Sequence, residues 1–211
     1  MYSFLLDIDN TIYSRKAGLL DALIDKAVQF IITRLNMDES EAVSLSRRFF
    51  SQYGAILDGL MFEYDIEPED FICEVFDIDV CYFLTPNVVL ADALSKLNGK
   101  KYAFSDSTCE YIKNVLDCLD ISSLFSGIYD RRFLKYNSKS NKNSYYIVLD
   151  YLSANPDECV LVDDKVANIC LAKEIGMNTV WVNEGDTTYL EEADFIIPAI
   201  HNIGQITRFT N

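Results

Sequence analysis

The sequence contains a single histidine, His201, and few residues that interrupt regular structure: eight glycines and four prolines. One histidine excludes a histidine-rich zinc site and argues against a Ser–His catalytic triad. Low glycine and proline content is typical of a globular domain rather than a disordered or collagen-like chain. Any chemistry in this chain must therefore depend on carboxylates, hydroxyls and lysines.

Positive charge is also scarce, because 18 lysines and arginines face 33 acidic residues and the net charge is −15. This balance argues against a nucleic-acid partner and against a basic membrane-binding face, since both need cations that meet phosphates. No apolar run approaches the roughly 18 residues that span a bilayer. The short apolar run at the N-terminus follows no basic region and is interrupted by Asp7, unlike a signal peptide. We therefore expect a cytoplasmic protein with no membrane partner.

The cysteines form no Cys-x-x-Cys pair. Scattered cysteines of this kind are typical of reduced, mostly packed thiols in an intracellular protein. We expect this state for all six of them: Cys73, Cys81, Cys109, Cys118, Cys159 and Cys170.

Apolar residues follow two kinds of spacing along the chain. From residue 18 to about residue 99 they recur at helical intervals, and afterwards short apolar runs alternate with amphipathic stretches. We expect strands at residues 2–6, 102–104, 127–129, 159–162, 179–182 and 195–197. We expect helices at residues 19–35, 39–50, 55–64, 68–76, 88–97, 108–119, 144–152 and 167–175.

Alternating strands and helices predict an α/β fold, an open Rossmann-like parallel sheet with helices on both faces. The helical block falls between the first strand and the others, so it is expected to be an insertion that caps the sheet. We therefore divide the chain into an α/β core, residues 1–14 and 89–211, and an α-helical cap, residues 15–88.

Acidic residues follow two of the predicted strands at the edge where parallel sheets bind ligands. Asp7 and Asp9 come after the first strand, and Asp163 and Asp164 come after a later one. Asp is common in turns at strand ends, but four acids gathered from distant segments repel one another unless a cation is bound. Oxygen ligands without His or Cys favour Mg²⁺ over zinc.

Residues 7–11, Asp-Ile-Asp-Asn-Thr, resemble the first motif of the haloacid dehalogenase-like (HAD) phosphohydrolases. The resemblance covers about residues 2–185: Ser105 stands at the second motif, Lys139 at the third, and the Asp163–Asp164 pair at the fourth. Residues 53–68 and the Ile-Tyr pair after the first motif resemble the pyrimidine 5′-nucleotidase-like HAD proteins.

The resemblance implies a mechanism for phosphate ester hydrolysis. Asp7 would attack phosphorus and form an aspartyl-phosphate, and Asp9 would protonate the leaving oxygen and then activate water. Mg²⁺ would be held by Asp7, the Asp9 backbone carbonyl and Asp164, with Asp163 in direct or indirect contact.

The substrate-binding residues implied by the resemblance are Asn10, Thr11, Ser105, Asp106 and Lys139. Ser105 would donate a hydrogen bond to the phosphate and Lys139 would neutralise it. Simpler roles stay open at this point, because Ser105 can equally cap the following helix.

Three further assignments stay open. The third-motif lysine can be Lys135 or Lys142 instead of Lys139, although the spacing favours Lys139. Asn168 can bond within the acidic loop or lie on a helix surface. Aromatic residues of the cap, Tyr53, Phe62 and Tyr64, are expected in its core, with stacking on a substrate base as the alternative.

The sequence departs from the family pattern in three places. Asp106 replaces a common Asn and adds a negative charge near the phosphate. Ser140 follows Lys139 where Pro is common, so we expect a less rigid loop. Residues 76–79 lack a common His, so a contact between cap and substrate is expected to be absent.

The leading hypothesis is a Mg²⁺-dependent phosphatase of a small phosphomonoester, with a pyrimidine nucleoside 5′-monophosphate as the first candidate. A sugar-phosphate phosphatase or a phosphomutase of the same superfamily is the alternative, whereas Asp9 argues against a dehalogenase. A HAD-like binding or regulatory protein with weak activity is also kept. A receiver-like signalling domain would be about half as long and would lack the helical insertion.

Overall fold

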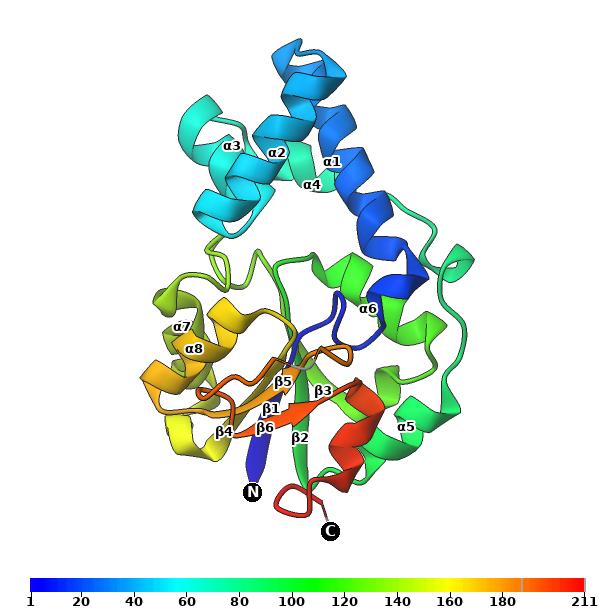
Figure 1. The fold of residues 1–211 in the computed structure, drawn as a ribbon, viewed down its shortest axis with the longest axis vertical. Helices are drawn as coiled ribbons and strands as arrows, with labels where there is room; N and C mark the ends of the chain where they lie inside the picture. The colour runs from blue at the N-terminus through cyan, green and yellow to red at the C-terminus, as the bar shows by residue number, and fades with distance from the viewer. Residues whose placement is uncertain (187, 211) are drawn as a thin grey trace.

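A parallel β-sheet forms the centre of the computed structural model, which describes residues 1–186 and 188–210 (Figure 1). The strand order is β3-β2-β1-β4-β5-β6, and each neighbouring pair is parallel. The strands are β1 (Tyr2–Leu6), β2 (Gly99–Phe104), β3 (Phe125–Tyr129), β4 (Cys159–Asp163), β5 (Asn178–Val182) and β6 (Phe195–Ile197). The predicted α/β class with an open parallel sheet is confirmed.

Eight α-helices accompany these strands in the described part of the chain. They are α1 (Leu19–Leu35), α2 (Glu39–Tyr53), α3 (Ile56–Tyr64), α4 (Pro68–Val75), α5 (Val88–Ser95), α6 (Cys109–Cys118), α7 (Lys142–Leu152) and α8 (Val166–Ile175). The predicted helices all appear, and the differences are confined to their ends. Within the described residues, none of these helices combines the length and the apolar character needed to cross a membrane.

Helices cover both faces of the sheet, and the strands alternate between the two cores as a period of two requires. Phe4 and Leu6 of β1 belong to one core, and Leu5 belongs to the other. The first core contains buried residues of α5 and α6 and of the short C-terminal helix η5 (Ile200–Gln205), in which His201 is exposed. The second core contains buried residues of α7 and α8.

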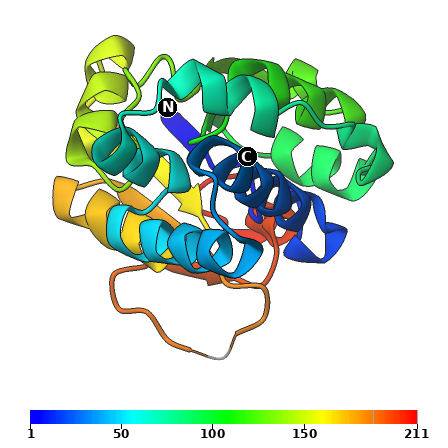
Figure 2. The ribbon, with the colours of Figure 1, turned by 90° about the horizontal axis from the view of Figure 1, so that it is seen from above.

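Helices α1–α4 stand together above one end of the sheet, as Figures 1 and 2 show. Local signals in the sequence set their ends. A reciprocal capping box between Asp38 and Glu41 opens α2, and Gly54, at φ 83°, ends it in the left-handed conformation. Pro68 occupies the first turn of α4, where its missing N–H costs nothing. We call residues 15–88 the cap, and this division remains our proposal.

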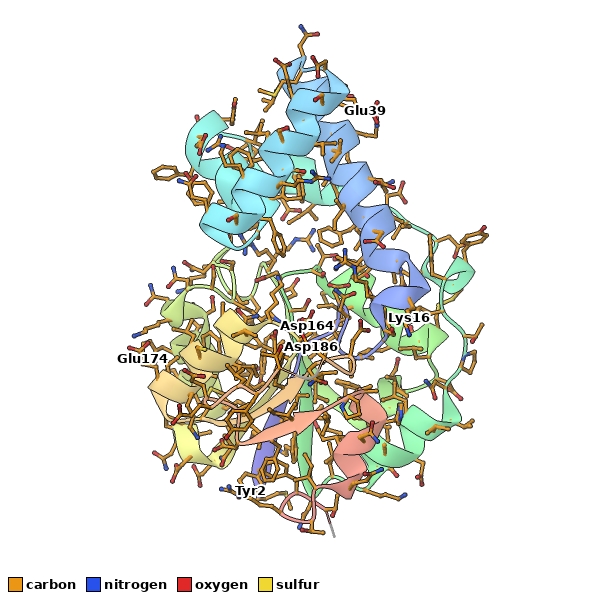
Figure 3. All side chains as sticks on the ribbon, in the orientation of Figure 1. Tyr2, Lys16, Glu39, Asp164, Glu174 and Asp186 are labelled. Atoms are coloured by element: carbon orange, nitrogen blue, oxygen red, sulfur yellow. A yellow bond between two sulfur atoms is a disulfide. The ribbon has the colours of Figure 1, made fainter. Side chains whose placement is uncertain are left out.

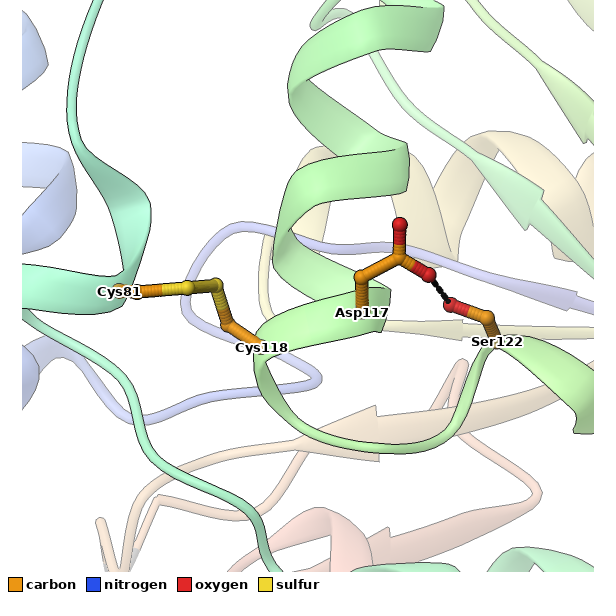
Figure 4. Close-up of a disulfide and its surroundings, with 4 residues drawn as sticks. All are labelled: Cys81, Asp117, Cys118 and Ser122. Atoms are coloured by element: carbon orange, nitrogen blue, oxygen red, sulfur yellow. Dashed lines mark hydrogen bonds between the residues drawn. A yellow bond between two sulfur atoms is a disulfide. The ribbon is translucent and has the colours of Figure 1, made fainter.

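A disulfide joins Cys81 to Cys118, with their Cα atoms 5.5 Å apart (Figure 4). It connects the segment that returns from the cap to the last residue of α6. The expectation of six reduced thiols was therefore wrong for this pair. The two cysteines lie 37 residues apart in sequence, and only the packing of the returning segment on α6 brings them within bonding distance. The other four cysteines are free thiols: Cys73, Cys109, Cys159 and Cys170.

Candidate active site

The sheet order places the ends of distant strands next to one another. Strand β1 lies between β2 and β4, and Leu6 is in register with Ala103 on one side and Val162 on the other. The backbone N–H of Asp7 extends this pairing by donating to Val162 O at 2.9 Å. The residues that follow β1, β2 and β4 therefore meet at the end of the sheet beneath the cap.

Three carboxylates gather at this end of the sheet. Oxygens of Asp7, Asp163 and Asp164 all lie within 4.8 Å of one another. Asp164 Oδ1 is buried and has no hydrogen-bond partner among the described residues, and burial together with Asp163 raises the pKa of Asp164 to about 6. Figure 3 shows Asp164 between the end of the sheet and helices α1–α4. An oxygen-only cluster with one orphaned acceptor fits a hard divalent cation such as Mg²⁺.

Lys139 lies inside the carboxylate cluster. Its Nζ is 2.7 Å from Asp163 Oδ2 and also bonds to Asp7 Oδ1, and the side chain is only 2% exposed. Burial alone would lower the pKa of Lys139, but Asp163 and Asp7 raise it well above its usual value. The alternative lysines lie elsewhere, because Lys142 pairs with a glutamate of α8 on the surface and Lys135 is exposed.

Asp163 is fixed by donors from its own loop. Asn168 Nδ2 donates to both carboxylate oxygens at 3.0 Å, and the backbone N–H of Lys165 donates to Oδ1 at 2.8 Å. Asn168 is buried, so of its two open interpretations the structure shows the bond within the acidic loop. These bonds hold Asp163 in the orientation that receives Lys139.

The remaining residues of the first motif surround Asp7. The Thr11 hydroxyl donates to Asp7 Oδ2 at 2.8 Å. Burial raises the pKa of Asp7 well above its usual value, although Lys139 acts in the opposite direction. Asn10 adopts the left-handed conformation, at φ 62°, and its buried Oδ1 has no partner among the described residues. Asn10 also lines the cavity described below.

The Asp9 carboxylate is not one of the three in the cluster, and it is held by three hydroxyls. Tyr13 and Tyr111 donate to Oδ1 at 2.5 and 2.7 Å, and Ser107 donates to Oδ2 at 2.7 Å. Its expected contribution to a metal site through the backbone carbonyl does not depend on this orientation. Ser107 and Tyr111 come from the start of α6, and no local pattern near Asp9 indicated them.

Ser105 is buried at the end of β2, and its Oγ accepts the backbone N–H of Ser107 at 3.1 Å. Helix α6 is capped by Thr108, whose side chain accepts from Tyr111 N. The alternative in which Ser105 caps this helix was therefore wrong. Ser105 instead lines the cavity, as Asp7 and Lys139 also do.

Asp106 is engaged by cations and donors rather than left as an unpaired charge. Its Oδ1 accepts the backbone N–H of Lys139 at 2.8 Å and lies 3.5 Å from Arg131 Nη1. The Arg131 guanidinium is 1% exposed and also bonds to Asp58 of α3. Sequence reasoning missed Arg131, whose only signal is an arginine pair directly after a predicted strand in a chain short of positive charge.

A cavity of about 640 Å³ lies between the end of the sheet and the cap. Its floor includes Asp7, Ser105 and Asp164. Its cap side is mainly apolar, with residues from α1–α4 and the segment after α4, among them Leu20, Leu23, Ile24, Phe50, Phe71 and Phe76. Three charged residues of the cap also line it: Arg15, Asp21 and Arg47.

The aromatic residues that reach this cavity are not the ones considered from the sequence. Tyr53, Phe62 and Tyr64 are absent from its lining, whereas Phe50 forms part of the wall with Lys165 Nζ 4.7 Å from its ring centre. The expectation that these three pack in the core of the cap was wrong for Phe62 and Tyr64, which are exposed, whereas Tyr53 packs against the core. Helical spacing alone does not tell which face of a cap helix meets the core, the cavity or solvent.

Comparison with known proteins identifies the fold. No family model matches the sequence. Phosphate metabolism protein 8 of Saccharomyces cerevisiae is 30% identical over 144 residues, which cover 61% of this chain and 44% of the yeast protein. The chain therefore spans less than half the length of this relative.

Solved structures agree over nearly the whole chain. A HAD phosphatase from Thermococcus onnurineus superposes with a TM-score of 0.66 at 18% identity, covering 98% of this chain and 97% of the other. An L-2-haloacid dehalogenase from Xanthobacter autotrophicus gives a TM-score of 0.65 at 14% identity, with 99% of both chains covered. The HAD-hydrolase YfnB from Bacillus subtilis, bound to magnesium, gives 0.61 at 14% identity, with 97% of both chains covered. The chain has the fold of the HAD-like hydrolases.

Proposed function

We propose that this protein is a Mg²⁺-dependent phosphatase of small phosphomonoesters that acts through an aspartyl-phosphate on Asp7. One observation carries the proposal. Lys139 joins Asp7 to Asp163 at the floor of the cavity, beside the unpartnered oxygen of Asp164. This arrangement combines a nucleophile, a cation for the phosphoryl oxygens and a vacant acceptor for a metal ion.

Asp7 and Asp164 would hold the metal ion together with the backbone carbonyl of Asp9, with Asp163 in direct or indirect contact. When bound, Mg²⁺ would reduce the repulsion between the anionic nucleophile and the anionic substrate. The YfnB structure, which has the same fold, is bound to magnesium and supports this assignment.

The chain's own residues supply the remaining chemistry. An Asp7 oxygen forms a bond to phosphorus as the ester oxygen leaves with a proton from Asp9. Asp9 then accepts a proton from water, whose oxygen attacks phosphorus and releases inorganic phosphate and free Asp7. Ser105 Oγ and Lys139 Nζ bind phosphoryl oxygens in both steps and stabilise the charge that develops there.

We propose a nucleoside 5′-monophosphate, with UMP and CMP first, as the substrate. The apolar cap side of the cavity supports an organic group with a flat apolar surface over a polyhydroxylated sugar, which needs many hydrogen-bonding partners. Sugar phosphates remain the alternative class. The cytoplasmic location expected from the sequence stays a prediction, and the Cys81–Cys118 disulfide removes the thiol argument for it.

The names of the similar proteins support hydrolysis but differ in substrate, because a phosphatase and a dehalogenase share this fold. Asp9 favours the phosphatase, since a dehalogenase needs no acid to protonate a leaving ester oxygen. The three hydroxyls that bond to Asp9, and its place in the lining of the cavity, support this role.

Phosphate release from a panel of nucleoside monophosphates and sugar phosphates, with and without Mg²⁺, tests the proposal. We expect release that requires Mg²⁺, is lost in Asp7→Asn, and is unchanged in the control Asp150→Asn, an exposed acid on α7. Halide release from 2-haloacids is measured in parallel. Absence of phosphate release from every substrate, or halide release instead, would overturn the proposal.

A further inference from the structure

Two consecutive arginines after β3 reach from the core to the cap. Arg131 bonds to Asp58 of α3, and Arg132 forms two bonds of 2.8 Å with Glu69 of α4. Two neighbouring residues of one core loop thus hold two different cap helices. The two pairs differ in burial, because Arg131 is 1% exposed and Arg132 is 32% exposed.

We call Arg131–Asp58 the inner pair and Arg132–Glu69 the outer pair. Contacts of the inner pair lead to the active site, whereas those of the outer pair do not. Arg131 Nη1 is 3.5 Å from Asp106 Oδ1, and the same oxygen accepts the backbone N–H of Lys139 at 2.8 Å. The backbone N–H of Arg131 also donates to Ser107 O at 3.1 Å. An unbroken series of contacts therefore runs from Asp58 in the cap to the backbone of Lys139.

Within this series of contacts, the Asp106 carboxylate requires a positively charged partner. The Asp106 side chain is only 21% exposed, and a largely buried carboxylate that accepts one backbone N–H has remaining lone pairs and an unbalanced charge. Arg131 supplies both the charge and a directed donor, and its planar guanidinium can bind two carboxylates at once. The same guanidinium thus serves a cap residue and a core residue, and movement of one changes its bond to the other.

We propose that Arg131 is a positioning residue of the phosphoryl-transfer site. By binding Asp58 and Asp106 together, it makes the placement of the Lys139 backbone depend on closure of the cap. Its relevance to catalysis rests on the function proposed above, but the coupling between cap and Lys139 can be measured without it.

The test uses Asp58→Asn, which breaks the inner pair from the cap side and leaves the core residues intact. The matched control is Glu69→Gln, which breaks the outer pair to the same loop. Asp58→Glu keeps the carboxylate and serves as the conservative rescue. All three substitutions lie in the cap, and thermal unfolding shows whether each variant is folded.

The first readout is amide hydrogen exchange of residues 137–141, which contain the Lys139 N–H bonded to Asp106. We expect Asp58→Asn to raise exchange in this segment about tenfold, a typical size for coupling between sites. Glu69→Gln should change exchange in α4 but leave residues 137–141 unaltered. Equal exchange of this segment in both variants would overturn the proposal.

The second readout is steady-state phosphate release with saturating Mg²⁺. We expect Asp58→Asn to lower kcat about tenfold with little change in KM, and Asp58→Glu to restore most of it. A rise in KM alone, or an equal loss of kcat in Glu69→Gln, would overturn the positioning role. If the wild-type protein releases no phosphate, the proposed function fails, and the exchange experiment alone decides the coupling.

Discussion

Two groups of acids meet in the same cavity, and each surrounds one buried cation. Asp7 and Asp163 bind Lys139, and Asp58 and Asp106 bind Arg131. Each group keeps a buried acceptor without a partner among the described residues, Asp164 Oδ1 in the first and Asp58 Oδ2 in the second. The second group also keeps an unpartnered donor, Arg131 Nε.

The number of acids around each cation separates a reactive site from a structural contact. The lysine group contains a third carboxylate, Asp164, so one cation leaves it strongly negative and able to bind a divalent ion. The arginine group has fewer acids and a guanidinium that binds both of them, so it holds two segments together. Acidic residues around a buried cation therefore do not by themselves define a metal site.

Removing one acid from each group gives the largest contrast. We expect Asp7→Asn to lower kcat by about 10³-fold or more, because the nucleophile is lost. Asp106→Asn should lower it less than about tenfold, because Asn still accepts the Lys139 N–H. Phosphate release at saturating substrate and Mg²⁺ measures both variants. Equal losses would remove the distinction between the two groups.

Removing the two cations tests whether a metal ion can replace each of them. Without Mg²⁺, Lys139→Met and Arg131→Met should each lose about 3–5 kcal/mol of unfolding free energy, because buried carboxylates are left unpaired. Mg²⁺ should restore the unfolding free energy of Lys139→Met and leave that of Arg131→Met unchanged. Urea unfolding with and without Mg²⁺ measures the difference.

The double variant Asp58→Asn with Arg131→Met is the control for the arginine group. It removes one acid with the cation, so it should lose less stability than Arg131→Met alone. If Mg²⁺ restored the stability of Arg131→Met, the arginine group would also bind the metal ion.

The pH dependence of stability tests whether the unpartnered Asp164 carboxylate destabilises the metal-free protein when it is ionised. Its pKa is raised from 3.8 to about 6, so its favourable contribution is complete below about pH 4 and is lost as pH rises through 6. Metal-free Asp164→Asn should therefore be more stable than wild type at pH 7.5, by up to about 3 kcal/mol, and not at pH 4. With Mg²⁺ at pH 7.5, wild type should instead be more stable than Asp164→Asn.

Thermal unfolding of both proteins at the two pH values, with EDTA or Mg²⁺, measures this prediction. Asp150→Asn is the matched exposed substitution and should follow wild type under each condition. A metal-free Asp164→Asn that is less stable than wild type at pH 7.5 would contradict the burial argument.

Reduction of the disulfide should give the smallest change in stability. Neither cysteine belongs to the lysine group or the arginine group. Reduction of Cys81–Cys118 should lower stability by about 2 kcal/mol, because it releases a closed loop in the unfolded chain. The loss should be equal with and without Mg²⁺. Thermal unfolding with and without dithiothreitol measures it, and Cys73→Ser should leave the effect of the reductant unchanged. A reductant effect that depends on Mg²⁺ would link the disulfide to the metal site.

The three departures from the family pattern show which contacts could not be predicted from the sequence. Asp106, expected to add repulsion, is bound by Arg131 and the Lys139 N–H. The Ser140 hydroxyl, expected only to loosen a loop, donates to the backbone of Tyr53 in the cap at 3.0 Å. Phe76, in the stretch expected to lack a substrate contact, lines the cavity. Each partner lies far away in the chain, so the local pattern did not indicate it.

The sequence by itself determined the elements and the sheet end at which chemistry gathers. Alternating short apolar runs and amphipathic stretches have periods of two and 3.6, which the backbone imposes on any strand or helix. Acids after two such runs, with Ser105 after a third, therefore predicted a cluster at one end of the sheet. The resemblance of residues 7–11 to a known motif added roles that remain proposals.

Only the tertiary structure decided which distant residues meet. The order of the strands places β1 between β2 and β4, and this brings Lys139 to Asp7 and Asp163 in preference to Lys135 or Lys142. The same packing joins Arg131 to the cap and Cys81 to Cys118. The physical reason is that local periodicity fixes which face of an element is apolar, whereas contacts across the fold depend on how those faces pack together.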